Sequence, residues 1–141
     1  MVVHDIVKDR PTLTVNHDET VLQVAQKMVD ANVGAVPVMR AGELFGIFSE
    51  RDLMRRIVVE GRNPARTRVA EVASLDIITV PPGESVEKCM FLMKQHGIRH
   101  LPICDGRRLL AIISLRDLLL HDVAEKDGEL QFMREYMRTG T

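Results

Sequence analysis

The sequence is poor in aromatic residues, in net charge and in long apolar runs, and each shortage excludes a class of protein. Aromatic side chains make up 4% of the 141 residues and the net charge is −1. This leaves little for stacking on bases and no general attraction to nucleic acid or anionic membranes. The apolar runs are only a few residues long, and "MVVHDIV" lacks the cationic start of a secretory leader. We therefore expect neither a nucleic-acid partner nor a membrane partner.

Cysteine is equally scarce. Cys89 and Cys104 are the only two, with no C-x-x-C spacing and no His at metal-ligand spacing. Both lie in apolar segments, so we expect two small buried hydrophobic side chains and assign no metal ligand. Free thiols fit a reducing, cytoplasmic location.

The chain contains an internal repeat with a period of 65 residues. Aligning residues 14–53 with residues 79–118 gives twelve identities without a gap, where ordinary composition would give roughly two or three. The identities include Ser49, Arg51 and Asp52, which fall on Ser114, Arg116 and Asp117. The chain is therefore a duplication.

Each copy predicts the same order of elements: a short strand, an amphipathic helix, two strands joined by a turn, and a second helix. The predicted first strands are 12–15 and 76–80, the hairpin strands 35–39 with 44–49 and 100–104 with 109–114. Asn32 and Gly97 are expected to end the first helices. Pro37 and Pro102 predict edge or interrupted strands rather than central ones.

These elements predict an α+β fold of two β-α-β-β-α halves, packed through their sheets about a pseudo-twofold axis. We expect a first motif at 1–60, a linker at 61–68, a second motif at 69–123 and a separate helix at 124–141. That last helix is amphipathic through five side chains, which could cover the domain or meet a partner chain: Leu130, Phe132, Met133, Tyr136 and Met137.

The repeated Ser-x-x-Asp lies where a strand meets a helix. It could simply cap the helix, or the same corner could hold a ligand. A carboxylate such as Asp52 can accept hydrogen bonds from a ribose diol, and the helix start suits a phosphate. Arg51 and Arg116 lie in the first helical turn, where a cation is unfavourable, and a ligand phosphate would explain both.

The segments "VGAVPVMRAGELFGIFSERDL" and "GIRHLPICDGRRLLAIISLRDLL" resemble the two halves of a CBS-domain pair, or Bateman module. The resemblance covers about residues 5–123, and "SERDLMRRIVVEGRNPARTRVAEV" is similar to small stand-alone bacterial members. It implies reversible binding of an adenosine ligand (AMP, ADP, ATP, NAD(H) or S-adenosylmethionine) in clefts between the halves. It also implies a homodimer that regulates a partner protein and is not itself an enzyme.

Position by position, the resemblance implies two clefts. The first would use Asp117, Ser114 and Arg116 at the ribose and phosphate, with Leu13, Val33, Gly34, Lys8 and His100 around the ligand. The second would use Asp52, Ser49, Arg51 and Arg55, with Ile78, Ile98 and Arg99 around the base. Arg99 stands where the first copy has Gly34, so it could fill the second base slot or reach a phosphate in the first cleft. The sequence therefore favours the Asp117 cleft.

The sequence leaves three functions to be distinguished. A regulatory module that binds AMP, ATP or NAD(H) leads, with an S-adenosylmethionine binder as a variant. A structural homodimer without a nucleotide is the alternative. An enzyme is disfavoured because the sequence has no Walker loop, no paired carboxylates with an obvious metal and no Ser/His/Asp arrangement.

Overall fold

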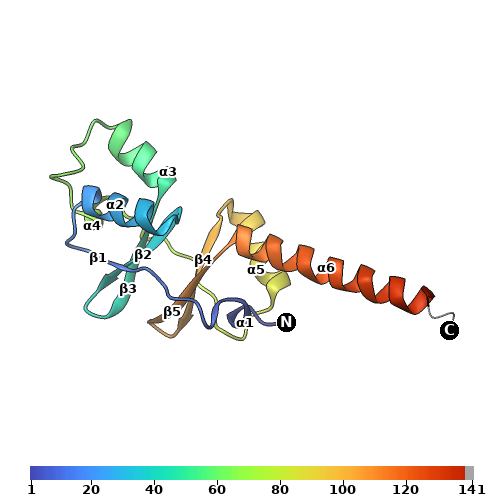
Figure 1. Cartoon of the computed structure of the whole chain (residues 1–141). Coiled ribbons are helices and arrows are strands. Elements are labelled where there is room, and N and C mark those ends of the chain that lie inside the picture. The colour runs from blue at the N-terminus through green and yellow to red at the C-terminus, as the bar shows by residue number, and fades with distance from the viewer. Residues whose placement is uncertain (139–141) are drawn as a thin grey trace.

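A computed structural model describes residues 1–138, apart from the side chains of Val123, Ala124 and Tyr136 (Figure 1). The first half contains α1 (His4–Val7), β1 (Val15–Asn16), α2 (Val21–Ala31), β2 (Ala35–Arg40), β3 (Glu43–Ser49), α3 (Glu50–Asp52) and the π-helix η1 (Leu53–Val58). The second half contains α4 (Val69–Val72), α5 (Val86–His96), β4 (His100–Asp105), β5 (Arg108–Ser114) and α6 (Leu115–Arg138). The mixed helix and strand content confirms the predicted α+β class.

The predicted helix ends are confirmed. Asn32 and Gly97 both adopt the left-handed conformation, with φ of 54° and 62°, which ends a helix by satisfying its last carbonyls. Thr20 caps α2, because its hydroxyl accepts the amide of Gln23. Ser85 caps α5 in the same way through Lys88.

The first strands differ between the halves. In the first half, β1 pairs in parallel with β2, and the amide of His17 donates to Met39. In the second half, the predicted strand at 76–80 is wrong, because Val80 makes only an isolated bridge to Ile103. The counterparts of Asn16 and His17 are Pro81 and Pro82, which have no N–H to extend a ladder.

The prediction that Pro37 and Pro102 occupy edge or interrupted positions is confirmed locally. β4, which contains Pro102, is an edge strand of a two-stranded sheet. β2, which contains Pro37, lies between β1 and β3, but its parallel pairing with β1 involves only Val38 and Met39. Pro37 therefore stands just outside the paired residues, where its missing N–H costs no hydrogen bond in that ladder.

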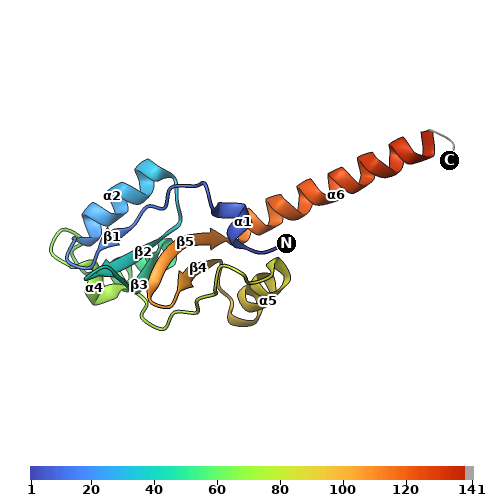
Figure 2. The same cartoon turned by 90° about the horizontal axis from the view of Figure 1, so that it is seen from below.

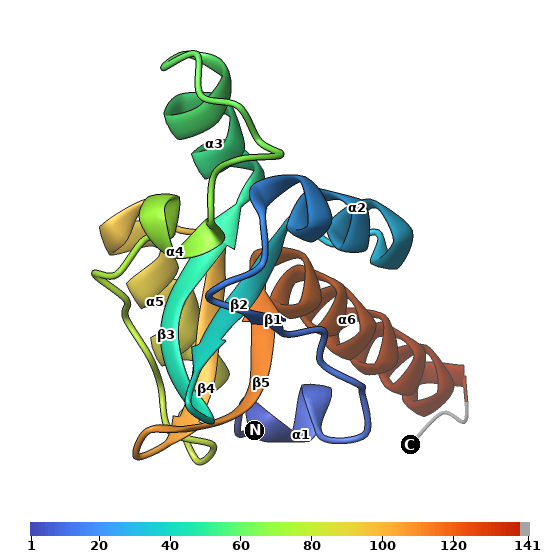
Figure 3. The same cartoon turned by 90° about the vertical axis from the view of Figure 1, so that its left-hand side faces the viewer.

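Each short leading helix packs on the other half of the duplication. Val3 and Val7 of α1 lie in the core formed by the second copy, whereas Val69 and Val72 of α4 lie in the core of the first. Figures 2 and 3 show the strands of both halves side by side between flanking helices, and β3 contacts β5. The exchange of leading helices locks the halves together and brings the loop after α1 to the second half.

The C-terminal segment forms one helix, not the two that the sequence predicts. α6 runs from Leu115 to Arg138 without a break and projects away from the two sheets (Figure 1). Gly128, inside this helix, costs only about 1 kcal/mol relative to Ala, too little to end it. Within residues 1–138, no helix combines the length and the apolar character needed to cross a membrane.

Candidate functional site

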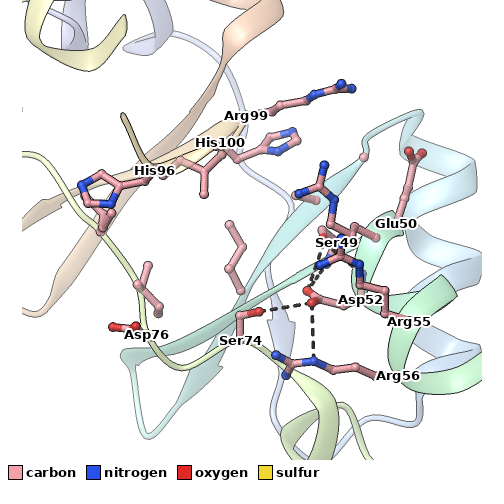
Figure 4. Close-up of a pocket in the computed structure, with 18 residues that line it drawn as sticks. Ser49, Glu50, Asp52, Arg55, Arg56, Ser74, Asp76, His96, Arg99 and His100 are labelled. Atoms are coloured by element: carbon pink, nitrogen blue, oxygen red, sulfur yellow. Dashed lines mark hydrogen bonds and ion pairs between the residues drawn. The ribbon is translucent and has the colours of Figure 1, made fainter. Parts of the chain in front are cut away.

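A cavity of about 460 Å³ opens where the first Ser-x-x-Asp corner faces the second half of the chain (Figure 4). One side comes from β3, α3 and η1 of the first half. The opposite side comes from residues 74–78, before α5, and from residues 96–100, at the start of β4. This volume is typical of a small-molecule site.

Asp52 is the buried carboxylate of this cavity, with only 8% of its surface exposed. Ser49 donates to Asp52 Oδ2 through both its amide and its hydroxyl, each at 3.0 Å, and Ser49 Oγ accepts the amide of Asp52 at 3.2 Å. The motif is thus a capping box that stabilises the start of α3. Capping and facing the cavity occur together, so the two interpretations of the motif do not exclude each other.

Two residues from outside the motif complete the carboxylate's surroundings. Ser74 Oγ donates to Asp52 Oδ1 at 3.2 Å, and Arg56 Nε forms an ion pair with the same oxygen at 3.8 Å. Arg56 also donates to the carbonyls of Val72 and Ala73. Arg56 therefore joins η1 to the segment that carries Ser74.

The remaining cavity wall is part apolar and part charged, with the carboxylates of Glu50 and Asp76 beside the arginines. The apolar part is formed by four isoleucines: Ile47, Ile77, Ile78 and Ile98. The arginines include Arg51, Arg55 and Arg99. Arg55 belongs to the π-helix η1, in which the amide of Val59 donates to Met54 rather than to the residue four positions earlier; such turns are frequent at functional sites.

The structure brings together all seven residues predicted for the Asp52 cleft. They line this single cavity: Ser49, Arg51, Asp52, Arg55, Ile78, Ile98 and Arg99. Gly34 and His100, predicted for the other cleft, lie here too. Burial lowers the pKa of His100, Asp117 and Glu50 oppose that effect, and Arg99 adds to it, so a neutral imidazole is favoured at this wall.

At the second corner the carboxylate is already engaged. Ser114 donates its amide to Asp117 Oδ2 at 2.8 Å and caps α6 as Ser49 caps α3. In addition, Arg10 Nη1 donates to Asp117 Oδ1 at 2.7 Å, and Arg10 Nη2 donates to Oδ2 at 2.9 Å. Burial raises the pKa of Asp117, but the hydrogen bonds from Arg10 and Ser114 outweigh it and the net pKa is lowered.

The other residues predicted around Asp117 have different surroundings, and their grouping around a ligand stays a prediction. Leu13 and Val33 are partly buried against the core of the first half. Lys8 and Arg116 are exposed to solvent.

Sequence reasoning missed Arg10, Ser74 and Arg56. The repeat gives no signal for them, because their counterparts at a shift of 65 residues are Leu75, Asp9 and His121. A comparison of the two copies finds only what the copies share, so residues unique to one corner are invisible to it.

The cysteines are buried as expected. Cys89 is fully inaccessible and Cys104 nearly so, and both are free. Burial raises the pKa of the Cys89 thiol to about 11, and Glu84 adds to this, so it is not a reactive thiolate. Among the described residues, no three His, Cys, Asp or Glu side chains are grouped to hold a metal ion.

The chain is a duplicated α+β module: two halves with the same order of elements pack together, and a cavity lies at their interface. The chain belongs to the CBS-domain family, whose sequence profile matches residues 3–59 and 69–124. CBS-domain pairs are in general regulatory, ligand-binding modules rather than catalytic ones.

Relatives in several organisms support this assignment. The chain is 37% identical to the CBS domain-containing protein YhcV of Bacillus subtilis, over 86% of this chain and 89% of that protein. It is 35% identical to the mitochondrial CBS domain-containing protein CBSX3 of Arabidopsis thaliana over 87% of this chain, and spans 62% of that protein's length. A protein with CBS domains from Burkholderia ambifaria, whose structure is solved, superposes with a TM-score of 0.82 at 33% identity, covering 88% of this chain and 95% of that one.

Proposed function

We propose that this protein binds an adenine nucleotide (AMP, ATP or NAD(H)) reversibly in the Asp52 cavity and regulates a partner protein according to its occupancy. The observation that carries the proposal is the buried carboxylate of Asp52, held at the wall of a cavity lined by isoleucines and arginines. The proposal takes the Asp52 cleft in place of the Asp117 cleft that the sequence favours, because Asp117 is already bound by Arg10.

The ribose is assigned to Asp52 and Ser74. Asp52 Oδ2 already accepts two hydrogen bonds from Ser49, which fill its lone pairs. Asp52 Oδ1 accepts one hydrogen bond, from Ser74 Oγ, and so has room for one ribose hydroxyl. Because the hydroxyl hydrogen of Ser74 is donated to Asp52, the Ser74 oxygen is left to accept a hydrogen bond from the second ribose hydroxyl. A vicinal diol matches this pair of acceptors.

The phosphate is assigned to the arginines. Arg51, Arg55 and Arg99 all line the cavity, and guanidinium groups bind phosphate oxygens in bidentate fashion. The same cluster disfavours S-adenosylmethionine, whose sulfonium is a cation. An anionic ligand is therefore favoured over that variant.

The base is assigned to the apolar wall. Ile78 and Ile98 are partly buried side chains of the second half that face the cavity. β-Branched side chains present a stiff, flat surface, and a planar purine buries its faces against such a surface.

Isothermal titration calorimetry with AMP, ATP and NAD⁺ tests the proposal. We expect saturable binding to the wild-type protein and a loss of roughly 10- to 100-fold in affinity for Asp52→Asn, the size of one lost charged hydrogen bond. Asp117→Asn is the matched control, because it makes the same change in the other capping box, and its affinity should equal that of the wild type. Equal losses in both variants, or no binding heat with any of the three ligands, would contradict the proposal.

Self-association is a second component of the proposed function, and α6 supports it. This helix projects from the module and exposes apolar side chains: Leu119, Leu120, Leu130, Phe132, Met133 and Met137. Leu118, near the start of α6, is buried in the core, but the exposed side chains do not cover the domain. Hexameric CBS-CP12 protein from bloom-forming cyanobacteria is a structural neighbour, with a TM-score of 0.76 and 27% identity over 99% of this chain and 87% of that one.

We accordingly propose a homodimer that buries these exposed apolar side chains of α6. We also propose a reducing, cytoplasmic location, which suits the two free cysteines. Light scattering after size exclusion should give a dimer mass for the wild-type protein and a monomer mass for a Leu130→Glu/Met133→Glu variant. Glu129→Gln/Glu135→Gln, which alters charged positions of the same helix, serves as the control and should stay dimeric. A wild-type monomer at micromolar concentration would refute this component and leave nucleotide binding untouched.

A further inference from the structure

The side chain of Arg10 reaches from the first half of the chain to the carboxylate of the second. Arg10 lies in the loop between α1 and β1, and its two terminal nitrogens bind the two oxygens of Asp117 at 2.7 and 2.9 Å. Nη2 also donates to the carbonyl of Ile112 at 3.1 Å. This bidentate geometry is the strongest form of an arginine–carboxylate contact.

The contact uses the acceptors that a sugar would need. Asp117 Oδ2 accepts from both Ser114 and Arg10, which fills its lone pairs, and Oδ1 accepts from Arg10 Nη1. Asp117 and Asp52 accept the same number of hydrogen bonds, but the guanidinium of Arg10 has no acceptor atom, whereas the hydroxyl of Ser74 beside Asp52 can accept. The second hydroxyl of a ribose diol therefore finds no partner at Asp117 while Arg10 is bound there. The guanidinium, with two parallel N–H groups, occupies the place of the two hydroxyls.

The backbone explains why this happens in one half only. At the first corner, the amide of Ser74, from the second half, donates to the carbonyl of Ile47 at 2.8 Å. That carbonyl corresponds to Ile112, which accepts from Arg10 instead. Close approach of Ser74 requires Gly46, because a Cβ there would stand 2.9 Å from the carbonyl oxygen of Ser74.

The second half has Ala111 at the position of Gly46. Its methyl group would crowd a backbone that approached as closely as Ser74 does. Among the described residues no backbone hydrogen bond joins the loop after α1 to Ile112, and Arg10 Nη2 donates to that carbonyl instead. The counterpart of Arg10 in the second half is Leu75, which has no charged side chain that could pair with Asp52.

We propose that Arg10 is a built-in occupant of the Asp117 cleft, which restricts the module to one nucleotide per chain, bound in the Asp52 cavity. This inference rests on the proposed function for the identity of the ligand. Arg10 is thus a specificity-determining residue: it prevents the Asp117 corner from binding the nucleotide that the related Asp52 corner binds.

The test is the stoichiometry of AMP binding by calorimetry, with native mass spectrometry as a second count. We expect one AMP per chain for the wild-type protein and two for both Arg10→Ala and Arg10→Met. The double variant Arg10→Ala/Asp117→Asn should return to one. Arg107→Ala, which removes a largely exposed arginine elsewhere, is the charge control and should bind one.

Each result decides the inference separately from the proposed function. Two AMP per wild-type chain, or one per Arg10→Ala chain that unfolds as cooperatively as the wild type, overturns the inference while nucleotide binding stands. No AMP on the wild type but one on Arg10→Ala supports the inference and refutes binding at Asp52. No AMP on either protein overturns both.

Discussion

The two strand-to-helix corners are the most instructive pair of regions in this molecule. Both present Ser-x-x-Asp after a hairpin strand, and in both the serine caps the helix with the same amide and hydroxyl contacts. The carboxylates nevertheless have different neighbours. Asp52 accepts from the hydroxyl of Ser74 and has the guanidinium of Arg56 only at 3.8 Å, whereas Asp117 is held by two direct hydrogen bonds from the guanidinium of Arg10.

A repeated motif therefore fixes the local geometry of the corner, but not whether its carboxylate is free to bind a ligand. Capping depends on residues within the motif itself, so duplication preserves it. What reaches the carboxylate depends on the chain that crosses from the other half. Here the copies differ in the crossing residues, Ser74 and Arg10, and also by a methyl group at Gly46 and Ala111. The following variants break or sharpen that difference.

The largest effect is expected at the phosphate side. Arg51→Met should weaken AMP binding by roughly 10- to 100-fold, because a charge-assisted hydrogen bond contributes about 1.5–3 kcal/mol. The affinity for adenosine, which has no phosphate, should stay unchanged. Arg116→Met, the same change at the other corner, should alter neither affinity, as calorimetry with both ligands can establish. Equal weakening of AMP and adenosine by Arg51→Met would remove this arginine from the phosphate site.

A second variant gives the Asp52 corner the alanine that stands at the equivalent position of the Asp117 corner. Gly46→Ala places a Cβ 2.9 Å from the backbone oxygen of Ser74, so the Ser74 segment must shift. We expect a loss of about 1–3 kcal/mol in the free energy of unfolding, as for other overpacked sites. Urea denaturation measures it. AMP affinity should fall as well, since the shift withdraws the Ser74 hydroxyl from Asp52.

The reverse substitution is the control. Ala111→Gly removes a methyl group without forcing any contact, so it should cost only about 0.5–1 kcal/mol, the usual penalty for glycine in a strand. If Gly46→Ala proved as mild as Ala111→Gly, the close approach at Ser74 would not require glycine, and the physical explanation for the unequal corners would be lost.

Most of the fold follows from the sequence because its signals are local and repeated. The caps at Asn32 and Gly97, the hairpins and the duplicated order of elements all depend on neighbouring residues. The failures have local causes as well. Pro81 and Pro82 limit the second copy's first strand to one bridge, and Gly128 is too weak a breaker to divide α6.

The sequence predicts those residues of the candidate site that belong to the repeated motif or correspond between the two copies, and it misses the others. The seven residues expected around Asp52 do line one cavity, because each belongs to a motif or to its pseudo-symmetric counterpart. Arg10 and Ser74 act across more than 20 residues of sequence and have no counterpart of the same type. Their roles arise from packing between the halves, which a one-dimensional comparison does not contain.

The smallest effect is the pH dependence of the Arg10 contact. Because the folded pKa of Asp117 is lowered, the ion pair stabilises the protein above the ordinary aspartate pKa of about 3.9. That stabilisation is lost as the pH falls through the lowered folded value. The side chain of Arg10 is 44% exposed, so solvent screening limits the contribution to about 0–1 kcal/mol. Urea denaturation should therefore separate wild-type protein from Arg10→Met slightly at pH 7, and the difference should shrink as the pH falls below the ordinary aspartate pKa. Groups such as His100 titrate in both proteins and cancel in the difference. A difference that grew on acidification would show that Arg10 acts on stability through packing of its hydrocarbon stem and not through the carboxylate of Asp117.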